Sequence, residues 1–171
     1  MAVMTWTAPE VPEVDGPTTG PERPLVAGYL AWQRNKVLEV CAGLTAEQLA
    51  TASAPPSTLT LLGLVRHLAK VERTWWRIRL DHQDVAPLYP PGTDEDFDRL
   101  DPARAAEEFE TLRAEWATCD AVAARYDLDD EFDNRGETMS VRMLYVHLIG
   151  EYAQHNGHAD LVRERVLSSE G

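Results

Sequence analysis

The sequence is poor in cysteine and in positive charge. Its 171 residues include 2 cysteines, Cys41 and Cys119, without CxxC spacing. This excludes a disulfide framework and a thiolate metal knuckle, and it fits a reducing cytoplasm. The 16 Lys and Arg residues are outnumbered by 29 Asp and Glu residues, which gives a formal net charge of −13. Such a charge disfavours attraction to nucleic acid or to an anionic membrane surface, so we expect a small-molecule partner.

Long apolar runs and nucleotide-binding loops are lacking as well. No stretch approaches the roughly 18 apolar residues that a transmembrane helix needs, and the N-terminus has no basic start followed by an apolar core. We therefore expect a cytoplasmic protein that is neither exported nor embedded in a membrane. The sequence has no glycine-rich phosphate loop and no nucleophile elbow. Cys41 and Cys119 lie on apolar helical faces, which favours a place in the core over a role as nucleophile.

Helical periodicity dominates the remaining sequence. Residues 1–24 contain five prolines and are expected to form an irregular N-terminal tail, and residues 168–171 a short C-terminal tail. Residues 25–167 then form one domain. The stretch 83–101 contains three prolines, Gly92 and an acidic run, and it predicts a long, solvated crossover between the second and third helices. We therefore predict an all-α fold, a four-helix bundle. Its helices span residues 25–42, 59–80, 102–126 and 141–167.

The last predicted helix carries ionisable side chains where an apolar core is expected. Three of the five histidines and one carboxylate share a single stripe of this helix when it is drawn at about 100° per residue. Burial of such groups is costly unless something binds to them. The stripe consists of Leu144, His147, Leu148, Glu151, His155, His158 and Val162.

These groups predict a metal site together with His67, which lies on the inward face of the second helix. Glu151 and His155 are four residues apart, so both reach the same side of their helix. Two imidazoles and one carboxylate suit a divalent transition metal, zinc first and nickel as a second choice, and leave a position open to water or substrate. The alternative is a hydrogen-bonded core, which would leave a buried charge unpaired. His147 and His158 can line the pocket, and His158 can also replace a ligand.

Three segments of the chain resemble a known family. CAGLTAEQL, PSTLTLLGLVRHLAKVE and SVRMLYVHLIGEYAQHNGHADLVRE are similar, in this order, to landmarks of the DinB/YfiT-like superfamily, near its mycothiol-dependent maleylpyruvate isomerases of actinobacteria. The resemblance implies a metal-binding four-helix bundle in which His67, Glu151 and His155 are the ligands. Glu151 stands where the wider superfamily has a histidine, and His158 where it has glutamine. Whether Glu151 or His158 completes the ligand set therefore stays open.

The resemblance also implies a function. It favours a metal-dependent S-transferase or isomerase that activates a small thiol such as mycothiol against a small electrophile, with His158 or His147 moving the proton. One alternative is a non-catalytic, metal-stabilised stress or binding protein, and another is a metal-dependent hydrolase. A homodimer is a further implication. The residues alone do not decide whether the chain is an enzyme, because all three functions need the same ligands.

Overall fold

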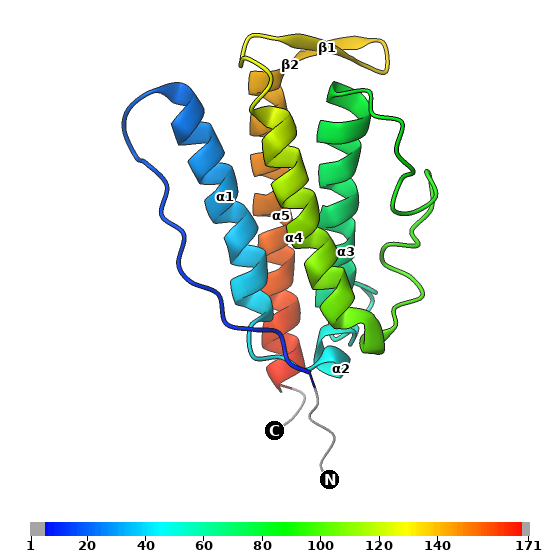
Figure 1. Cartoon of the computed structure of the whole chain (residues 1–171). Helices are drawn as coiled ribbons and strands as arrows, with labels where there is room; N and C mark the ends of the chain where they lie inside the picture. The colour runs from blue at the N-terminus through cyan, green and yellow to red at the C-terminus, as the bar shows by residue number, and fades with distance from the viewer. Residues whose placement is uncertain (1–5, 169–171) are drawn as a thin grey trace.

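The computed structural model describes residues 6–168 and is mostly helical. Four long helical rods lie side by side, and a small two-stranded sheet covers one end of them (Figure 1). Short helical turns occur at α2 (Ala46–Leu49) and at the 3-10 helix η2 (Pro102–Arg104). The long rods are α1 (Glu22–Cys41), α3 (Leu61–Glu72) with the π-helix η1 (Arg73–Leu80), α4 (Ala105–Ala123) and α5 (Val141–Ser168).

The two-stranded sheet corrects the expectation of an all-α fold. Strands β1 (Glu131–Asn134) and β2 (Glu137–Ser140) pair in antiparallel register in the connection between α4 and α5. Arg135 and Gly136 connect them with φ values of 60° and 91°, as in a two-residue type I′ turn. Buried Phe132 anchors the hairpin. Four residues per strand are too few for alternation to stand out in an acidic segment.

The second predicted helix changes its winding at Arg73. Thr60 caps α3, since its hydroxyl accepts a hydrogen bond of 2.9 Å from the backbone N–H of Gly63. From Arg73 to Leu80 the rod continues as a π-helix. Its i→i+5 hydrogen bonds widen each turn, so side chains lie on different faces from those that an α-helical wheel predicts. This change matters for the site described below.

The core lies between two helix pairs. The helix α1 packs along α5, α3 packs along α4, and α3 also contacts α5. Leucines fill the space between them, and several leave no more than 1% of their surface exposed. These leucines include Leu30, Leu64, Leu68, Leu112, Leu144 and Leu148.

Among the described residues no helix is long and apolar enough to cross a membrane.

The N-terminal segment from Trp6 to Pro21 contains no helix and is docked on the helices that follow. Ala8 donates from its backbone N–H to the carbonyl of Leu44, and Gly43 donates back to Ala8, each at 2.9 Å. The Trp6 ring packs edge-on against Phe109 with centroids 5.4 Å apart. The first helix begins at Glu22, three residues before the predicted start at residue 25. Residues 1–5 of the predicted N-terminal tail and 169–171 of the C-terminal tail lie outside the described residues.

The crossover between η1 and η2 is less solvated than predicted, because part of it is pinned to α3. Buried Arg66 donates to the carbonyl of Glu95 at 2.8 Å and to that of Asp98 at 3.0 Å. A Cβ on Gly63 would lie 3.1 Å from the Phe97 ring, so this glycine makes room for the crossover. As a result the side chain of Asp96 is fully buried against α3.

Candidate metal centre

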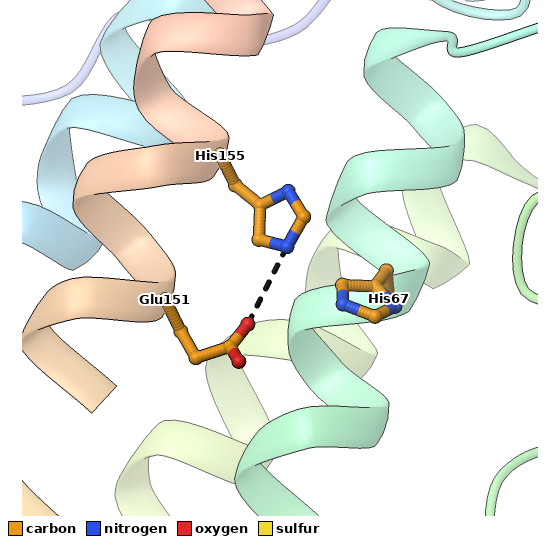
Figure 2. A group of neighbouring side chains, drawn as sticks. All are labelled: His67, Glu151 and His155. Atoms are coloured by element: carbon orange, nitrogen blue, oxygen red, sulfur yellow. Dashed lines mark ion pairs between the residues drawn. The ribbon is translucent and has the colours of Figure 1, made fainter. Parts of the chain in front are cut away.

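The structure brings His67, Glu151 and His155 together. His67 comes from α3, and the other two residues lie one turn apart on α5, facing it (Figure 2). One ligand atom from each residue lies within 4.8 Å of the other two. Within the triad, His155 Nε2 is 3.4 Å from Glu151 Oε2. This cluster is compact enough for one ion to contact two imidazoles and a carboxylate.

Asp96 orients His67. Its Oδ2 lies 2.7 Å from Nδ1 of His67, and its Oδ1 accepts a hydrogen bond of 2.9 Å from Lys70. Burial by itself raises the pKa of Asp96, but the hydrogen bonds from His67 and Lys70 outweigh it and lower the pKa to about 2. Because Nδ1 faces a carboxylate, the ring turns Nε2 toward Glu151 and His155. A carboxylate behind the imidazole is the usual support of a histidine that binds a metal.

His147 and His158 flank the triad on α5. His147 Nε2 is 3.7 Å from Glu151 Oε1, and the ring centroid of His158 is 5.5 Å from that of His155. The hydrogen bond from His155 lowers the pKa of Glu151, although burial opposes this shift. Burial also lowers the pKa of His147. His147 therefore lies beside Glu151, and His158 beside His155.

Unsatisfied nitrogen atoms are concentrated at this site. Five buried side-chain polar atoms of residues 6–168 have no hydrogen-bond partner, and three of them belong to histidines of α5. They are His147 Nε2, His155 Nδ1 and His158 Nδ1. Buried polar atoms are normally paired, because an unpaired one loses its hydrogen bonds to water without replacement. The site thus has the capacity to accept further partners.

Sequence reasoning missed three residues around the triad. Asp96 and Phe97 belong to the crossover, where Phe97 stacks on His67 at a centroid distance of 4.8 Å. The Trp75 ring packs against the His147 ring with a centroid distance of 4.2 Å. The acidic run offers no signal that separates Asp96 from its exposed neighbours. Trp75 lies in η1, and a wheel drawn for an α-helix misplaces it.

The cysteine thiols are not candidates for the nucleophile. Both are fully buried, as predicted. Burial raises the pKa of Cys41 to about 12, and burial together with the nearby Glu72 carboxylate raises that of Cys119 as well. Since the thiolate is the reactive form, neither side chain is activated. A nucleophilic thiol would have to come from a substrate.

Comparison with known proteins identifies a family for the chain. No curated protein matches the chain. The family model described as Mycothiol-S-transferase matches residues 25–167, which include the whole triad. This match confirms the predicted resemblance to the mycothiol-related group of DinB/YfiT-like proteins. With most of its length covered by that model, the chain belongs to the mycothiol S-transferase family.

Proposed function

We propose that the protein is a metal-dependent S-transferase that joins mycothiol to a small electrophile. The observation that carries the proposal is the approach of one ligand atom each from His67, Glu151 and His155 to within 4.8 Å of one another. We assign these residues as the ligands of a divalent ion, with zinc preferred and nickel also suited to the donor set. In the same proposal the four long helices form a four-helix bundle of the DinB/YfiT type.

The residues present fit such an ion. His67 is held by Asp96 through Nδ1, which leaves Nε2 as the ligand atom that we assign to it. Glu151 contributes a negative charge, and His155 approaches it from the next turn of α5. When bound, a divalent ion favours the thiolate form of a nearby thiol, which is the nucleophilic form. Three protein ligands also leave room for that thiol, which fits a catalytic rather than a closed structural site.

The flanking histidines are placed to handle the proton. His147 and His158 each have a buried nitrogen without a hydrogen-bond partner, one on either side of the triad. In the proposed reaction one of them accepts the thiol proton as the sulfur forms a bond to carbon of the electrophile. The leaving group departs with its bonding electrons. An isomerase would use the same addition but expel the thiol again.

Two experiments with one protein sample test the proposal. Protein purified without a His tag is assayed for bound zinc and nickel by elemental analysis, and for conjugation of mycothiol to a chlorodinitrobenzene by absorbance. We expect near-stoichiometric metal and conjugation in the wild type, and loss of both in His155→Ala. Gln154→Ala is the matched control, since Gln154 is exposed on the same helix and lies outside the triad. Conjugation that persists at full rate in His155→Ala contradicts the proposal.

A non-catalytic, metal-stabilised protein is the second candidate. It is favoured by one observation, namely that the ligands come from two helices, α3 and α5, which an ion would hold together. Metal would then raise thermal stability, while neither mycothiol conjugates nor ester hydrolysis products would appear. Ester hydrolysis without mycothiol would instead indicate the metal-dependent hydrolase. The homodimer and the cytoplasmic location stay predictions.

A further inference from the structure

A cavity that is separate from the triad lies along the same helical rod as His67. It has a volume of about 430 Å³ and opens between α3, η1, the crossover and the β1–β2 hairpin. Its floor is apolar and includes Ile78, Val85 and Pro87. Three cationic side chains, Lys70, Arg79 and Arg135, line it as well. Such a combination of apolar floor and convergent charge is typical of a site for a small organic anion.

Two of these cations lack a carboxylate partner. Arg79 donates to the neutral amide oxygen of Asn134 at 3.1 Å and lies 4.0 Å from the centroid of the Trp75 ring. Within residues 6–168, neither Arg79 nor Arg135 forms an ion pair, although the chain carries 29 acidic residues. Burial and the nearby Arg135 charge lower the pKa of Arg79. Two like charges held together in an acidic protein cost free energy that a bound anion would recover.

The backbone of Arg135 supports the same interpretation. It occupies the first position of the hairpin turn with a φ of 60°, a left-handed conformation that favours Asn, Asp or Gly. For an arginine this conformation is unfavourable, because its Cβ crowds the following carbonyl oxygen. The hairpin itself gains nothing from an arginine at this position. The side chain that this backbone carries lines the cavity instead.

The cavity is connected to the triad by two short chains of contacts. Lys70 shares the carboxylate of Asp96 with His67. On the other side, Arg79 covers Trp75, which contacts His147 beside Glu151. None of the triad residues lines the cavity, so a molecule held there would extend past Asp96 or Trp75 to reach the groups that we assign to metal and proton transfer.

We propose that this cavity binds the carboxylate of the electrophile, with Arg79 and Arg135 holding the anion and the apolar floor holding its hydrocarbon part. The inference rests on the proposed function and names the substrate class, a small organic acid with an electrophilic carbon. Mycothiol has no carboxylate, so the anion belongs to its reaction partner. Paired guanidinium groups suit a carboxylate because they offer hydrogen bonds in a planar arrangement.

Binding to the metal-free protein tests the cavity without reference to turnover. Benzoate and its neutral isostere benzamide are titrated by calorimetry. We expect benzoate to bind at least tenfold more tightly. Arg135→Asn is the sharpest variant, because asparagine suits the turn and the hairpin will keep its fold. We expect it to weaken benzoate binding at least tenfold without lowering the melting temperature, and Arg79→Gln to do the same to binding.

Arg113→Gln is the matched control, since it removes the same charge from α4 at a site paired with Glu110. Its benzoate affinity should equal that of the wild type. The inference is overturned if benzamide binds as tightly as benzoate, or if Arg113→Gln weakens benzoate as much as Arg135→Asn does. Either result alone would mean that no specific anion site exists.

Kinetics with the metal-loaded enzyme separate this inference from the proposed function. For a carboxylate-bearing electrophile, Arg79→Gln should raise KM at least tenfold, whereas KM for the methyl ester of the same electrophile should stay unchanged. Turnover of the ester without benzoate binding would overturn the anion site and leave the S-transferase proposal standing. Specific benzoate binding without turnover of either compound would support the anion site and remove the S-transferase proposal.

Discussion

Two clusters of ionisable side chains each include residues of α3 and α5, and they differ in how completely their polar atoms are paired. In the inner cluster, Glu72 accepts hydrogen bonds from Arg34 at 2.7 and 2.8 Å. The Tyr152 hydroxyl adds another at 2.8 Å. Glu72 and Tyr152 have no exposed surface, and Trp116 donates to the Tyr152 oxygen. The inner cluster is closed, since each of these side chains has a hydrogen-bond partner within it.

The outer cluster is the candidate metal centre, and it is open. Glu151 directly precedes Tyr152 in the chain but points to a different side of α5, where it lies beside His147 and His155. Buried nitrogen atoms there lack partners, whereas every side chain of the inner cluster is hydrogen-bonded. The comparison teaches that buried charge alone does not identify a functional site. Unused hydrogen-bonding and ligating capacity does, because a ligand can satisfy it.

Breaking the inner cluster should have the largest effect on stability. Glu72→Gln leaves the buried Arg34 guanidinium without its main countercharge, so we expect the free energy of unfolding to fall by about 3–5 kcal/mol. Urea denaturation of the metal-free protein measures it. Glu151→Gln is the counterpart in the outer cluster and should change that free energy by less than about 1 kcal/mol. Equal losses in the two variants would remove the distinction between the clusters.

Adding metal should stabilise the protein only through the outer cluster. At a zinc concentration 100 times Kd, the free energy of unfolding of the wild type should rise by about 2.7 kcal/mol. Glu151→Ala should lose this gain, and Tyr152→Phe, which alters only the inner cluster, should retain it. Denaturation with and without zinc checks both expectations. A zinc effect that survives in Glu151→Ala would assign the ion to other ligands, with His158 as the first alternative.

Acid should remove the stabilisation that the ionised Asp96 side chain provides. Its pKa is about 2 in the folded protein, against an ordinary value of 3.8. The unfolded chain therefore takes up this proton first as the pH falls. The corresponding stability, about 2 kcal/mol, is complete above pH 4 and is lost between about pH 4 and pH 2. Urea denaturation of the metal-free wild type and Asp96→Asn over this range measures the difference, with exposed Asp94→Asn as control. Parallel pH profiles for wild type and Asp96→Asn would contradict it.

A substitution on the outward face of α5 should have the smallest effect and touch neither cluster. A Cβ on Gly150 would meet nothing within 4 Å. Gly150→Ala should therefore raise the free energy of unfolding by about 0.5–1 kcal/mol through helix propensity and leave zinc binding unchanged. Gly63→Ala is the opposite case, because its Cβ would lie 3.0 Å from Thr60 and 3.1 Å from Phe97. It should lower stability, and thermal melting distinguishes the two signs.

Much of the candidate site could be predicted from the sequence, because it depends on helical spacing. His155 follows Glu151 by four residues, and any helix through this segment places both on one side. His67 could be predicted for the same reason on its own helix. The rest of the site depends on segments without periodicity. Asp96 lies in an acidic run and Arg135 in a turn that the sequence did not predict, so no local pattern assigns either of them to a pocket.

The sequence by itself determined which side chains share a face of each helix, because the period of an α-helix converts spacing into direction. It thereby determined that Glu151 and His155 share one side of α5 and favoured a core position for both cysteines. It also placed the ionisable stripe in the core, whereas Glu151 and His155 keep 29% and 13% of their side chains exposed. Only the tertiary structure decided which ionisable groups are closed and which are open. That depends on contacts between segments far apart in the chain, such as Asp96 with His67, and on the π-helical turns that bring Trp75 to His147. Their free energies arise from burial and pairing, which no local pattern of residues encodes.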